Sequence, residues 1–422
     1  MNELIRKLRL LLLTAFLAGI TGIFVGSFLY LLDLVTRFRL DHLNLLYLLP
    51  LVALLTTYAY QRAGKRADLG NNLLIGSIHD GERVPLRMAS LTFVFSILSH
   101  LVGASVGREG TGVQIGGTLG AKLSQSLNLD EAERRILTKA GISAGFGGIF
   151  GTPLGGAFFG LEMATVGKIS YEAILPCFLA SFIGMWSAAQ FPIHHLAFGV
   201  IELPVLSWKV LLMVTLASVL FGLTGRLFAW SVSTLKGFYR RTIVNPYLRG
   251  ILGAAPVMFL LVLGLDAYGG LSLGLIDRGF AGVSTLMDPV WKFLLTVLSL
   301  GAGFQGGEAT PLFAIGSSLG GYLGIASGIS PGLMAGLGLI GVFGSATNTP
   351  LTTIMLGIEL FGTGGLPYYT ITALLGYYAM GHNSIYAAQR IGTAKHDHLD
   401  HETGRSIREL QEERKEQDEH LA

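Results

Sequence analysis

Two glutamates in matching surroundings are the residues best suited to do chemistry in this sequence. Glu109 lies in Gly-Arg-Glu-Gly-Thr, and Glu308 lies in Gly-Gly-Glu-Ala-Thr-Pro, so a threonine follows each glutamate two positions later. The motifs come after apolar stretches at 89–106 and 293–304. Ionisable side chains at membrane depth are costly and are therefore functional candidates. A carboxylate in such a place can bind and release a proton.

Glu109 is expected at or near a helix N-terminus, because helix-permissive sequence follows its motif. The unpaired backbone N–H groups and the positive end of the dipole at such a terminus attract anions. An ionised Glu109 can occupy this anion site, and protonation removes the charge that holds it there. The predicted chemistry is the exchange of a proton for an anion. The alternative is a helix-capping acid paired with Arg108.

We expect different roles for the other three acidic residues in apolar surroundings. Glu308 and Thr310 are expected to start a second such helix, because Pro311 suits a first helical turn and Thr310 offers a hydroxyl donor. The alternative for both is a structural cap. Glu162 and Glu359 come late in their segments, where a helix dipole disfavours negative charge. We expect them to hydrogen-bond neighbouring backbone or helix termini and to carry no protons.

The segment from Gly103 to Gly107, Gly-Ala-Ser-Val-Gly, fits the G-x-S-x-G nucleophile elbow, with Ser105 as the nucleophile. That elbow requires a strand-to-helix turn in an α/β sheet, whereas this segment ends an apolar membrane stretch. An intramembrane serine hydrolase is kept as the alternative of another class, although the context argues against it. The main expectation is that the protein is not an enzyme.

Few other motifs suggest chemistry. The single cysteine, Cys177, excludes an intrachain disulfide framework and a cysteine-based metal cluster. The sequence has no H-E-x-x-H, P-loop or C-x-x-C motif, so a metalloprotease or a nucleotide-driven pump has no support. His396, His398 and His401 could ligate a metal, but the charged residues around them favour a solvated tail.

The elements that must position these residues are membrane helices. Of 422 residues, 51% are apolar and 14% are charged, whereas globular domains carry about 25% charged residues. Residues 10–32 contain no charge, and about 20 such residues cross the hydrocarbon core. This stretch is too long for the apolar part of a secretory signal and is expected to be a retained first helix. Several later apolar blocks are too short or too rich in glycine to be simple spans.

Basic residues indicate the orientation in the membrane. Arg6, Lys7 and Arg9 before the first apolar run favour a cytoplasmic N-terminus, and the basic residues at 236–249 favour a cytoplasmic loop. We expect a multi-pass protein of the cell's inner (plasma) membrane, with both termini in the cytoplasm.

Three motifs recur in the same order at an offset of about 200 residues. Gly-Ile-Thr-Gly at 19–22 matches Gly-Leu-Thr-Gly at 222–225, and the two Glu-x-Thr triplets match each other. Thr-Pro-Leu occurs at 152–154 and again at 349–351, each time with a glutamate nine positions after the proline.

This repetition predicts one transport domain, 1–394, with repeat halves at about 1–204 and 205–394, followed by a short polar cytoplasmic tail, 395–422. Repeats with interrupted helices place a substrate site near the bilayer midplane, between the halves. The repeat alone does not distinguish parallel from inverted halves.

At these motifs the sequence resembles the CLC family of chloride channels and chloride/proton antiporters, over nearly all of residues 1–394. The block Gly-Arg-Glu-Gly followed by Val-Gln-Ile-Gly-Gly, at 107–117, is highly specific, and the Thr-Pro-Leu-x-Gly segments also match. The resemblance implies an all-α integral membrane fold, an inverted repeat of many tilted and broken helices, and a homodimer with one pore per subunit.

The resemblance also assigns site residues. Glu109 matches the gating glutamate, and Glu308 is a second candidate for gating and proton coupling. Asn71 stands where the family's anion-binding serine would be, and Tyr386 matches the tyrosine that closes the anion site. The predicted anion-binding residues are Asn71, Thr310, Tyr386, Gly107, Arg108, Gly110, Thr111 and Ala309.

The departures from the family pattern resemble its bacterial fluoride/proton antiporter branch, which carries Gly-Arg-Glu-Gly-Thr and a second-half Glu-x-Thr-Pro. Fluoride is small, strongly hydrated and a strong hydrogen-bond acceptor. A site that selects it should therefore offer more close donors than a chloride site, and Asn71, Thr310 and Tyr386 would supply them.

The expected function is export of fluoride in exchange for protons. Met163 aligns with the internal proton-transfer glutamate of chloride antiporters, so the usual inner relay is missing. This leaves open a passive channel for chloride or fluoride. The expected partners are fluoride or chloride, protons, the lipid bilayer and a second subunit, with no cofactor, metal or nucleic acid.

Overall fold

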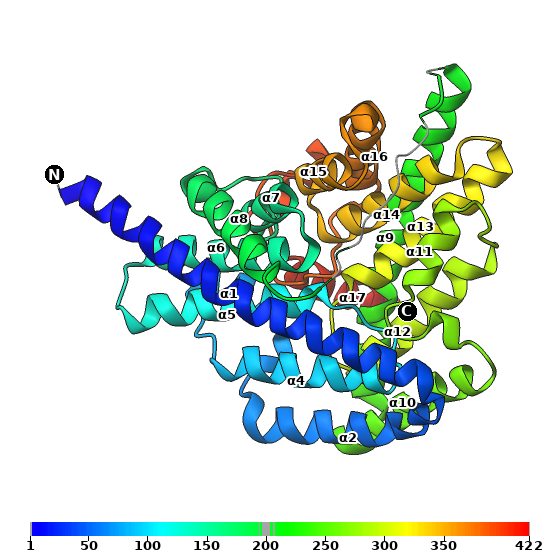
Figure 1. The fold of residues 1–422 in the computed structure, drawn as a ribbon, viewed down its shortest axis with the longest axis horizontal. Helices are drawn as coiled ribbons and strands as arrows, with labels where there is room; N and C mark the ends of the chain where they lie inside the picture. The colour runs from blue at the N-terminus through cyan, green and yellow to red at the C-terminus, as the bar shows by residue number, and fades with distance from the viewer. Residues whose placement is uncertain (1, 194, 196–202, 206, 422) are drawn as a thin grey trace.

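The computed structural model describes residues 2–193, 195, 203–205 and 207–421. These residues are mostly helical (Figure 1). The α-helices of the first half are α1 Asn2–Asp41, α2 Leu49–Ala59, α3 Asn71–Asp80, α4 Arg87–Leu101, α5 Glu109–Ser126, α6 Glu131–Phe150, α7 Pro153–Glu162 and α8 Ile174–Ala188. Those that follow are α9 Trp208–Thr242, α10 Pro246–Val262, α11 Leu273–Phe280, α12 Met287–Ala302, α13 Ala309–Ser327, α14 Pro331–Thr347, α15 Pro350–Phe361, α16 Leu366–Met380 and α17 Ile407–Leu421.

Short elements connect these helices. The 3-10 turns are η1 Leu43–Leu48, η3 Ala67–Leu69, η4 Tyr171–Ala173, η5 Asp266–Tyr268, η6 Thr363–Gly365 and η7 Asp397–Glu402, and η2 Tyr60–Gly64 is a π-helical turn. Two-residue strands, β1 Thr165–Val166 and β2 Arg390–Ile391, pair in parallel. The chain that follows α16 therefore returns to the loop that follows α7.

The predicted repeat corresponds to matching helices in the two halves. The Gly-x-Thr-Gly motifs lie inside the long helices α1 and α9, as predicted. The Glu-x-Thr motifs lie at the start of α5 and α13, and the Thr-Pro-Leu motifs begin α7 and α15.

Among the described residues, five helical stretches are long and apolar enough to cross a membrane, namely Glu3–Asp41, Leu43–Gly64, Tyr171–Ala188, Trp208–Thr242 and Ala309–Ser327. Others, including α7 and α15, are too short to cross it alone.

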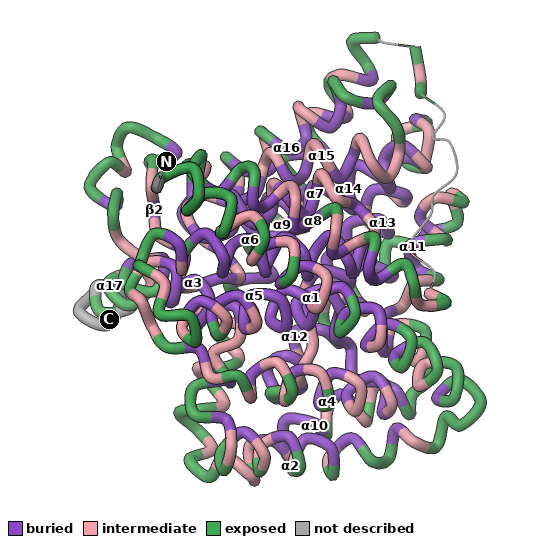
Figure 2. Tube along the Cα trace, turned by 60° about the vertical axis from the view of Figure 1, so that its left-hand side comes forward, coloured by how far each residue is buried: buried purple, intermediate pink, exposed green. Residues whose placement is uncertain are grey.

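Glycines let the central helices approach closely. On α5, Gly112, Gly116 and Gly120 are spaced four residues apart and face Gly145, Gly141 and Leu137 of α6 respectively. A Cβ at Gly116 would lie well inside van der Waals contact with the carbonyl oxygen of Gly141. Small residues at this spacing are typical of tightly packed membrane helices. Many of the 58 glycines are thus packing residues, and α5 and α6 lie in the buried centre of the molecule (Figure 2).

The second half repeats this packing. Gly316 and Gly320 of α13 face Gly338 and Met334 of α14, and a Cβ at either glycine would overlap a backbone oxygen of α14. Close glycine-mediated packing against the following helix therefore supports both α5 and α13, the two helices that begin at a Glu-x-Thr motif.

The end of the chain is folded against the transport domain. Glu402, Ile407 and Leu410 are buried, and α17 lies on the body of the molecule (Figure 2). The interpretation of this segment as a solvated tail is wrong for these residues, because apolar side chains three positions apart give α17 a buried face. No group of three or more metal-binding side chains occurs among the residues that the structure describes, the tail histidines included.

We expect Gly116→Ala to lower the thermal stability of the purified protein in detergent, because overpacking of this kind costs about 1–3 kcal/mol. Gly19→Ala is the matched control, since no atom lies within 4 Å of a Cβ there. The control should melt at or above the wild-type temperature. Equal melting temperatures for the two variants would contradict the packing argument.

Candidate functional site

The two Glu-x-Thr motifs meet at the centre of the molecule through their backbones. Gly107 N–H donates to Gly307 O and Gly307 N–H donates to Gly107 O, each with an N···O distance of 2.6 Å. A Cβ at Gly110 would lie 2.7 Å from the Cα of Gly307, so this approach requires glycine. The pairing brings the N-terminus of α5 against the N-terminus of α13.

Glu109 reaches across this junction to the opposite half. Its Oε2 accepts hydrogen bonds from Thr310 N–H, at 2.9 Å, and from the Thr310 hydroxyl. The same oxygen accepts from Arg108 N–H at 3.2 Å, and only 1% of Glu109 is exposed. The prediction of a helix N-terminus was correct, but the carboxylate mainly occupies the N-terminus of α13 and not that of its own helix. It therefore occupies a site suited to an anion.

Arg108 interacts only weakly with the Glu109 carboxylate, which argues against the alternative of a helix-capping acid paired with Arg108. Its Nε lies 3.4 Å from Oε1 of Glu109, longer than a good charge-assisted hydrogen bond. The shorter contacts of the carboxylate come from Thr310. The cap that Glu109 forms thus joins the two halves.

The two halves differ at this junction. Thr111, the counterpart of Thr310, turns its hydroxyl to Ser96 Oγ at 2.6 Å and is fully buried. Glu308, the counterpart of Glu109, lines a cavity and interacts electrostatically with Lys236 of α9. One acid therefore blocks a helix terminus, whereas the other faces open space.

A third helix N-terminus, that of α3, brings Asn71 to the same region. The Asn71 amide nitrogen lies close to Gly110, and its Oδ1 is buried without a hydrogen-bond partner. Tyr386 is buried beside it, with its hydroxyl within reach of the Asn71 side chain and in the electrostatic field of Glu109 and Glu308. The unpartnered amide oxygen of Asn71 and the buried hydroxyl of Tyr386 form a small polar cage at this point.

A cavity of about 640 Å³ opens from this cage to the surface. Asn71, Tyr386 and Glu308 line it together with basic side chains from three other helices. These basic residues are Lys236 and Arg240 of α9, Arg249 of α10 and Arg408 of α17. The cavity thus connects the polar cage to the surface along a wall with several basic side chains.

Glu162 and Glu359 form a reciprocal pair of caps between α7 and α15. Glu162 accepts from Leu351 N–H at 3.0 Å and from Thr352 N–H at 2.8 Å. Glu359 accepts from Leu154 N–H at 2.8 Å and from Gly155 N–H at 2.7 Å. The structure confirms that these glutamates bind helix termini, each on the opposite half.

Ser105 is part of a buried polar anchor. Its hydroxyl bonds Thr296 Oγ1 at 2.8 Å and accepts from Lys292 Nζ at 2.9 Å. Lys292 also donates to Gly270 O and Ser272 Oγ, and both Ser105 and Lys292 are fully buried. The segment joins α4 to α5 and lacks the strand of a nucleophile elbow. Ser105 in this motif therefore anchors the loop between α4 and α5.

The structure brings the predicted site residues to one place. Those at the junction are Asn71, Gly107, Arg108, Glu109, Gly110, Ala309 and Thr310, and those lining the cavity beside it are Glu308 and Tyr386. Thr111 is adjacent, but its hydroxyl faces Ser96.

Sequence reasoning missed Gln114 and Lys236. Gln114 lines the cavity near Gly70 and has a buried Oε1 without a partner, and its position one turn and a half after Glu109 was the available signal. Lys236 was interpreted only as part of a basic loop, whereas it lies within α9 beside Glu308.

Comparisons with known proteins extend over both halves of the chain. A family model described as voltage gated chloride channel matches residues 51–381. A chloride/fluoride channel protein of Pseudomonas syringae pv. tomato is 41% identical over 393 residues, covering 90% of this chain and 87% of that protein. The crystal structure of a CLC-type fluoride/proton antiporter is 35% identical, with a TM-score of 0.88, and covers 91% of this chain and 98% of that one.

A more distant structure supports the fold alone. The structure of a slow cyanobacterial chloride/proton antiporter is 20% identical, with a TM-score of 0.75. It covers 88% of this chain and 94% of that one.

Thr310→Val should weaken fluoride binding by about tenfold and chloride binding less, because a hydrogen bond to a charged group contributes about 1.5–3 kcal/mol. Calorimetric titration of the purified protein with each halide measures this. Thr111→Val is the control, since that hydroxyl is bonded to Ser96. An unchanged fluoride-to-chloride affinity ratio in Thr310→Val would show that the Thr310 hydroxyl does not select the anion.

Glu162→Gln should reduce stability and leave ion coupling intact. Glutamine keeps one acceptor oxygen but turns an NH₂ donor toward the N–H groups of α15, a mismatch that costs about 1–3 kcal/mol. Thermal melting in detergent and coupled ion flux in liposomes measure the two effects. Loss of coupling in a variant of wild-type stability would give Glu162 a transport role instead.

Proposed function

Because this chain belongs to the CLC family of voltage-gated chloride channels, we propose that it exports fluoride in exchange for protons. It is a multi-pass membrane protein and an anion transporter, and the exchange of fluoride for protons is the specific proposal. One observation carries it: the Glu109 carboxylate occupies the anion-coordinating N-terminus of α13 and is held there by Thr310.

This contact makes an anion and the ionised carboxylate competitors. The Thr310 N–H and hydroxyl stabilise negative charge, whether the charge belongs to Glu109 or to an entering anion. Protonation of Glu109 removes its charge, so the side chain leaves and an anion takes its place. Return of the carboxylate requires loss of the proton and expels the anion. Each cycle thus exchanges one species for the other.

The donors around the junction favour fluoride. Fluoride is a strong hydrogen-bond acceptor with a high cost of dehydration, so a selective site must replace water with close donors. Thr310 supplies an N–H and a hydroxyl, the Asn71 amide lies beside Gly110, and the Tyr386 hydroxyl lies beside Asn71. The relatives named for chloride/fluoride and for fluoride/proton transport carry the same implication.

Glu308 is the proposed inner partner for the proton. Met163 is fully buried, and its thioether cannot carry a proton. Glu308, by contrast, lines the cavity beside Lys236. A proton that enters through the cavity can bind Glu308 before it reaches Glu109.

Met163 also supports the second candidate, a passive halide channel of the same fold. Without an internal acid at this position, proton delivery to Glu109 depends on Glu308. If Glu308 does not deliver protons, anions would pass whenever Glu109 swings out, and no fixed number of protons would accompany them.

The proposal includes an orientation and an assembly. By the positive-inside rule, the basic residues around the cavity and near the start of α1 support a cytoplasmic location for the cavity and for both termini. The membrane is the cell's inner (plasma) membrane. The working unit is a homodimer with one transport path in each subunit.

Glu109→Gln tests the exchange directly. The amide mimics the protonated acid, so fluoride-loaded liposomes containing this variant should lose coupled proton uptake. Wild-type liposomes should show fluoride-selective efflux with stoichiometric proton uptake, measured with a fluoride electrode and a pH electrode with and without a protonophore. Glu359→Gln, which alters an acid at the other junction, should stay coupled.

Two results would overturn the proposal. Wild-type coupling in Glu109→Gln would remove Glu109 from the mechanism. Rapid efflux from wild-type liposomes without proton movement would make the protein a channel.

A further inference from the structure

The start of α17 is hydrogen-bonded to the loop that carries Tyr386. Ile407 N–H donates to Gln389 O at 2.9 Å, and Arg408 N–H donates to Ala387 O at 2.8 Å. These are N–H groups of the first helical turn, which have no partner within their own helix. The loop thus supplies the carbonyls that the N-terminus of α17 requires.

The opposite side of the same loop is held by the transport domain. Ala388 N–H donates to Asn72 Oδ1 at 2.8 Å, next to Asn71 at the start of α3. Gln389 Nε2 donates to Met163 O and to Thr347 O, both at 2.8 Å. Residues 387–389 therefore lie between α17 and the ends of membrane helices, and Tyr386 directly precedes them.

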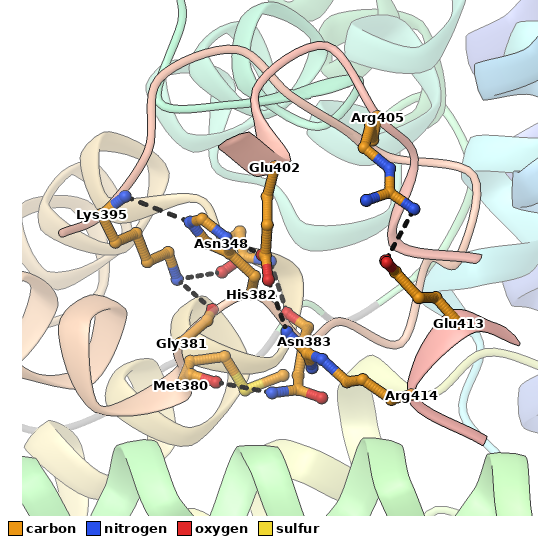
Figure 3. A network of polar contacts seen from close by, with 10 residues as sticks. All are labelled: Asn348, Met380, Gly381, His382, Asn383, Lys395, Glu402, Arg405, Glu413 and Arg414. Atoms are coloured by element: carbon orange, nitrogen blue, oxygen red, sulfur yellow. Dashed lines mark hydrogen bonds and ion pairs between the residues drawn. The ribbon is translucent and has the colours of Figure 1, made fainter. Parts of the chain in front are cut away.

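Lys395 fixes the beginning of the segment (Figure 3). Its Nζ donates to Asn348 Oδ1 at 2.6 Å and to Gly381 O at 2.8 Å, and it lies 3.8 Å from the centroid of the Tyr377 ring. Asn348 in turn donates to Gln389 Oε1 at 3.2 Å. The buried Lys395 ammonium thus caps the C-terminus of α16. The Asn348 side chain links it to the loop that carries Tyr386.

A second anchor lies further along the segment. The buried Glu402 carboxylate bonds His382 Nδ1 and accepts from Arg414 of α17 at 3.1 Å (Figure 3). Burial alone would raise the pKa of Glu402, but the hydrogen bonds from His382 and Arg414 outweigh it and lower the pKa below its ordinary value. Glu402 is therefore ionised at neutral pH, and this anchor is complete there.

Apolar contacts complete the docking of α17. Ile407 and Leu410 are buried in one cluster with Val166, Tyr377 and Ile391. The exposed side of the same helix places Arg408, Gln411 and Glu412 on the wall of the cavity that reaches Tyr386. One face of α17 thus holds the helix in place while another borders the transport path.

We propose that residues 395–414 are a brace that fixes Tyr386 at the inner mouth of the anion path. The brace acts on position and not on chemistry, because none of its side chains contacts the Glu109 carboxylate. When α17 leaves its seat, the carbonyls of Ala387 and Gln389 lose their donors and the loop gains freedom. Tyr386 then closes the path less well, and anions leak past without protons. This inference rests on the coupled transport proposed above.

Leu410→Asp tests the brace, because it places a charge in the buried cluster without touching Tyr386. In fluoride-loaded liposomes, the number of fluoride ions released per proton should rise severalfold over wild type. Arg405→Gln is the matched control, since Arg405 pairs with Glu413 at 2.8 Å within the same segment and does not line the cavity. The control should keep the wild-type ratio. Glu402→Gln is the milder variant if Leu410→Asp does not fold.

A double variant separates positioning from a general loss of stability. Tyr386→Ala should itself raise the ratio, and Leu410→Asp should add little to it, because both remove the same closure. Effects that multiply would overturn the proposal. Wild-type coupling in a folded Leu410→Asp protein would also overturn it.

Amide hydrogen exchange gives a readout that does not require transport. Peptides covering 384–391 should exchange faster in Leu410→Asp than in wild type and in Arg405→Gln. Unchanged exchange there would contradict the brace. If wild-type liposomes show no coupled flux while this exchange difference is present, the proposed function fails and the brace stands.

Discussion

Glutamates cap buried helix N-termini across the two halves, at α7, α13 and α15, and this is the interaction on which the rest of the structure depends. Backbone N–H groups without partners are costly where water is scarce. Glu162 caps α15 and Glu359 caps α7 in a reciprocal pair, whereas Glu109 caps α13 without a returning partner. The first pair ties the halves together. In the exchange proposed above, the single cap is the position where another anion replaces a carboxylate.

The glycine content follows from this constraint. For a carboxylate of one half to reach a helix of the other, the two Glu-x-Thr loops must meet at backbone distance, as Gly107 and Gly307 do. The helices behind them must also pack without side chains, as α5 does with α6 and α13 with α14. Small residues in this fold therefore allow the backbones at the site to approach each other, in addition to stabilising the helix bundle.

The sequence predicted the repeat, the CLC-type inverted fold and the helix N-termini at Glu109 and Ala309. Duplication leaves matched motifs, which reveal the repeat, and Glu-x-Thr and Pro mark where helices begin. The inverted arrangement followed only from the resemblance to the CLC family. It could not predict that Glu109 caps the helix of the other half, since motif spacing does not say which termini face each other. The folded tail escaped notice because Ile407 and Leu410 are a small apolar face among many charges. The interaction of Lys236 with Glu308 was not predicted, because Lys236 belongs to a basic cluster that the positive-inside rule already explains.

The different fates of Thr111 and Thr310 have a consequence for how such a protein can arise. Two identical, unlinked halves related by a twofold axis would each carry a Glu-x-Thr loop, and each acid would cap the other's helix. The path would then be closed twice and would have no open side. Joining the halves in one polypeptide allows the two loops to diverge, so that one threonine turns to Ser96 and one acid turns to the cavity. A single covalent chain thus allows a pseudosymmetric scaffold to place different side chains on the two sides of one junction.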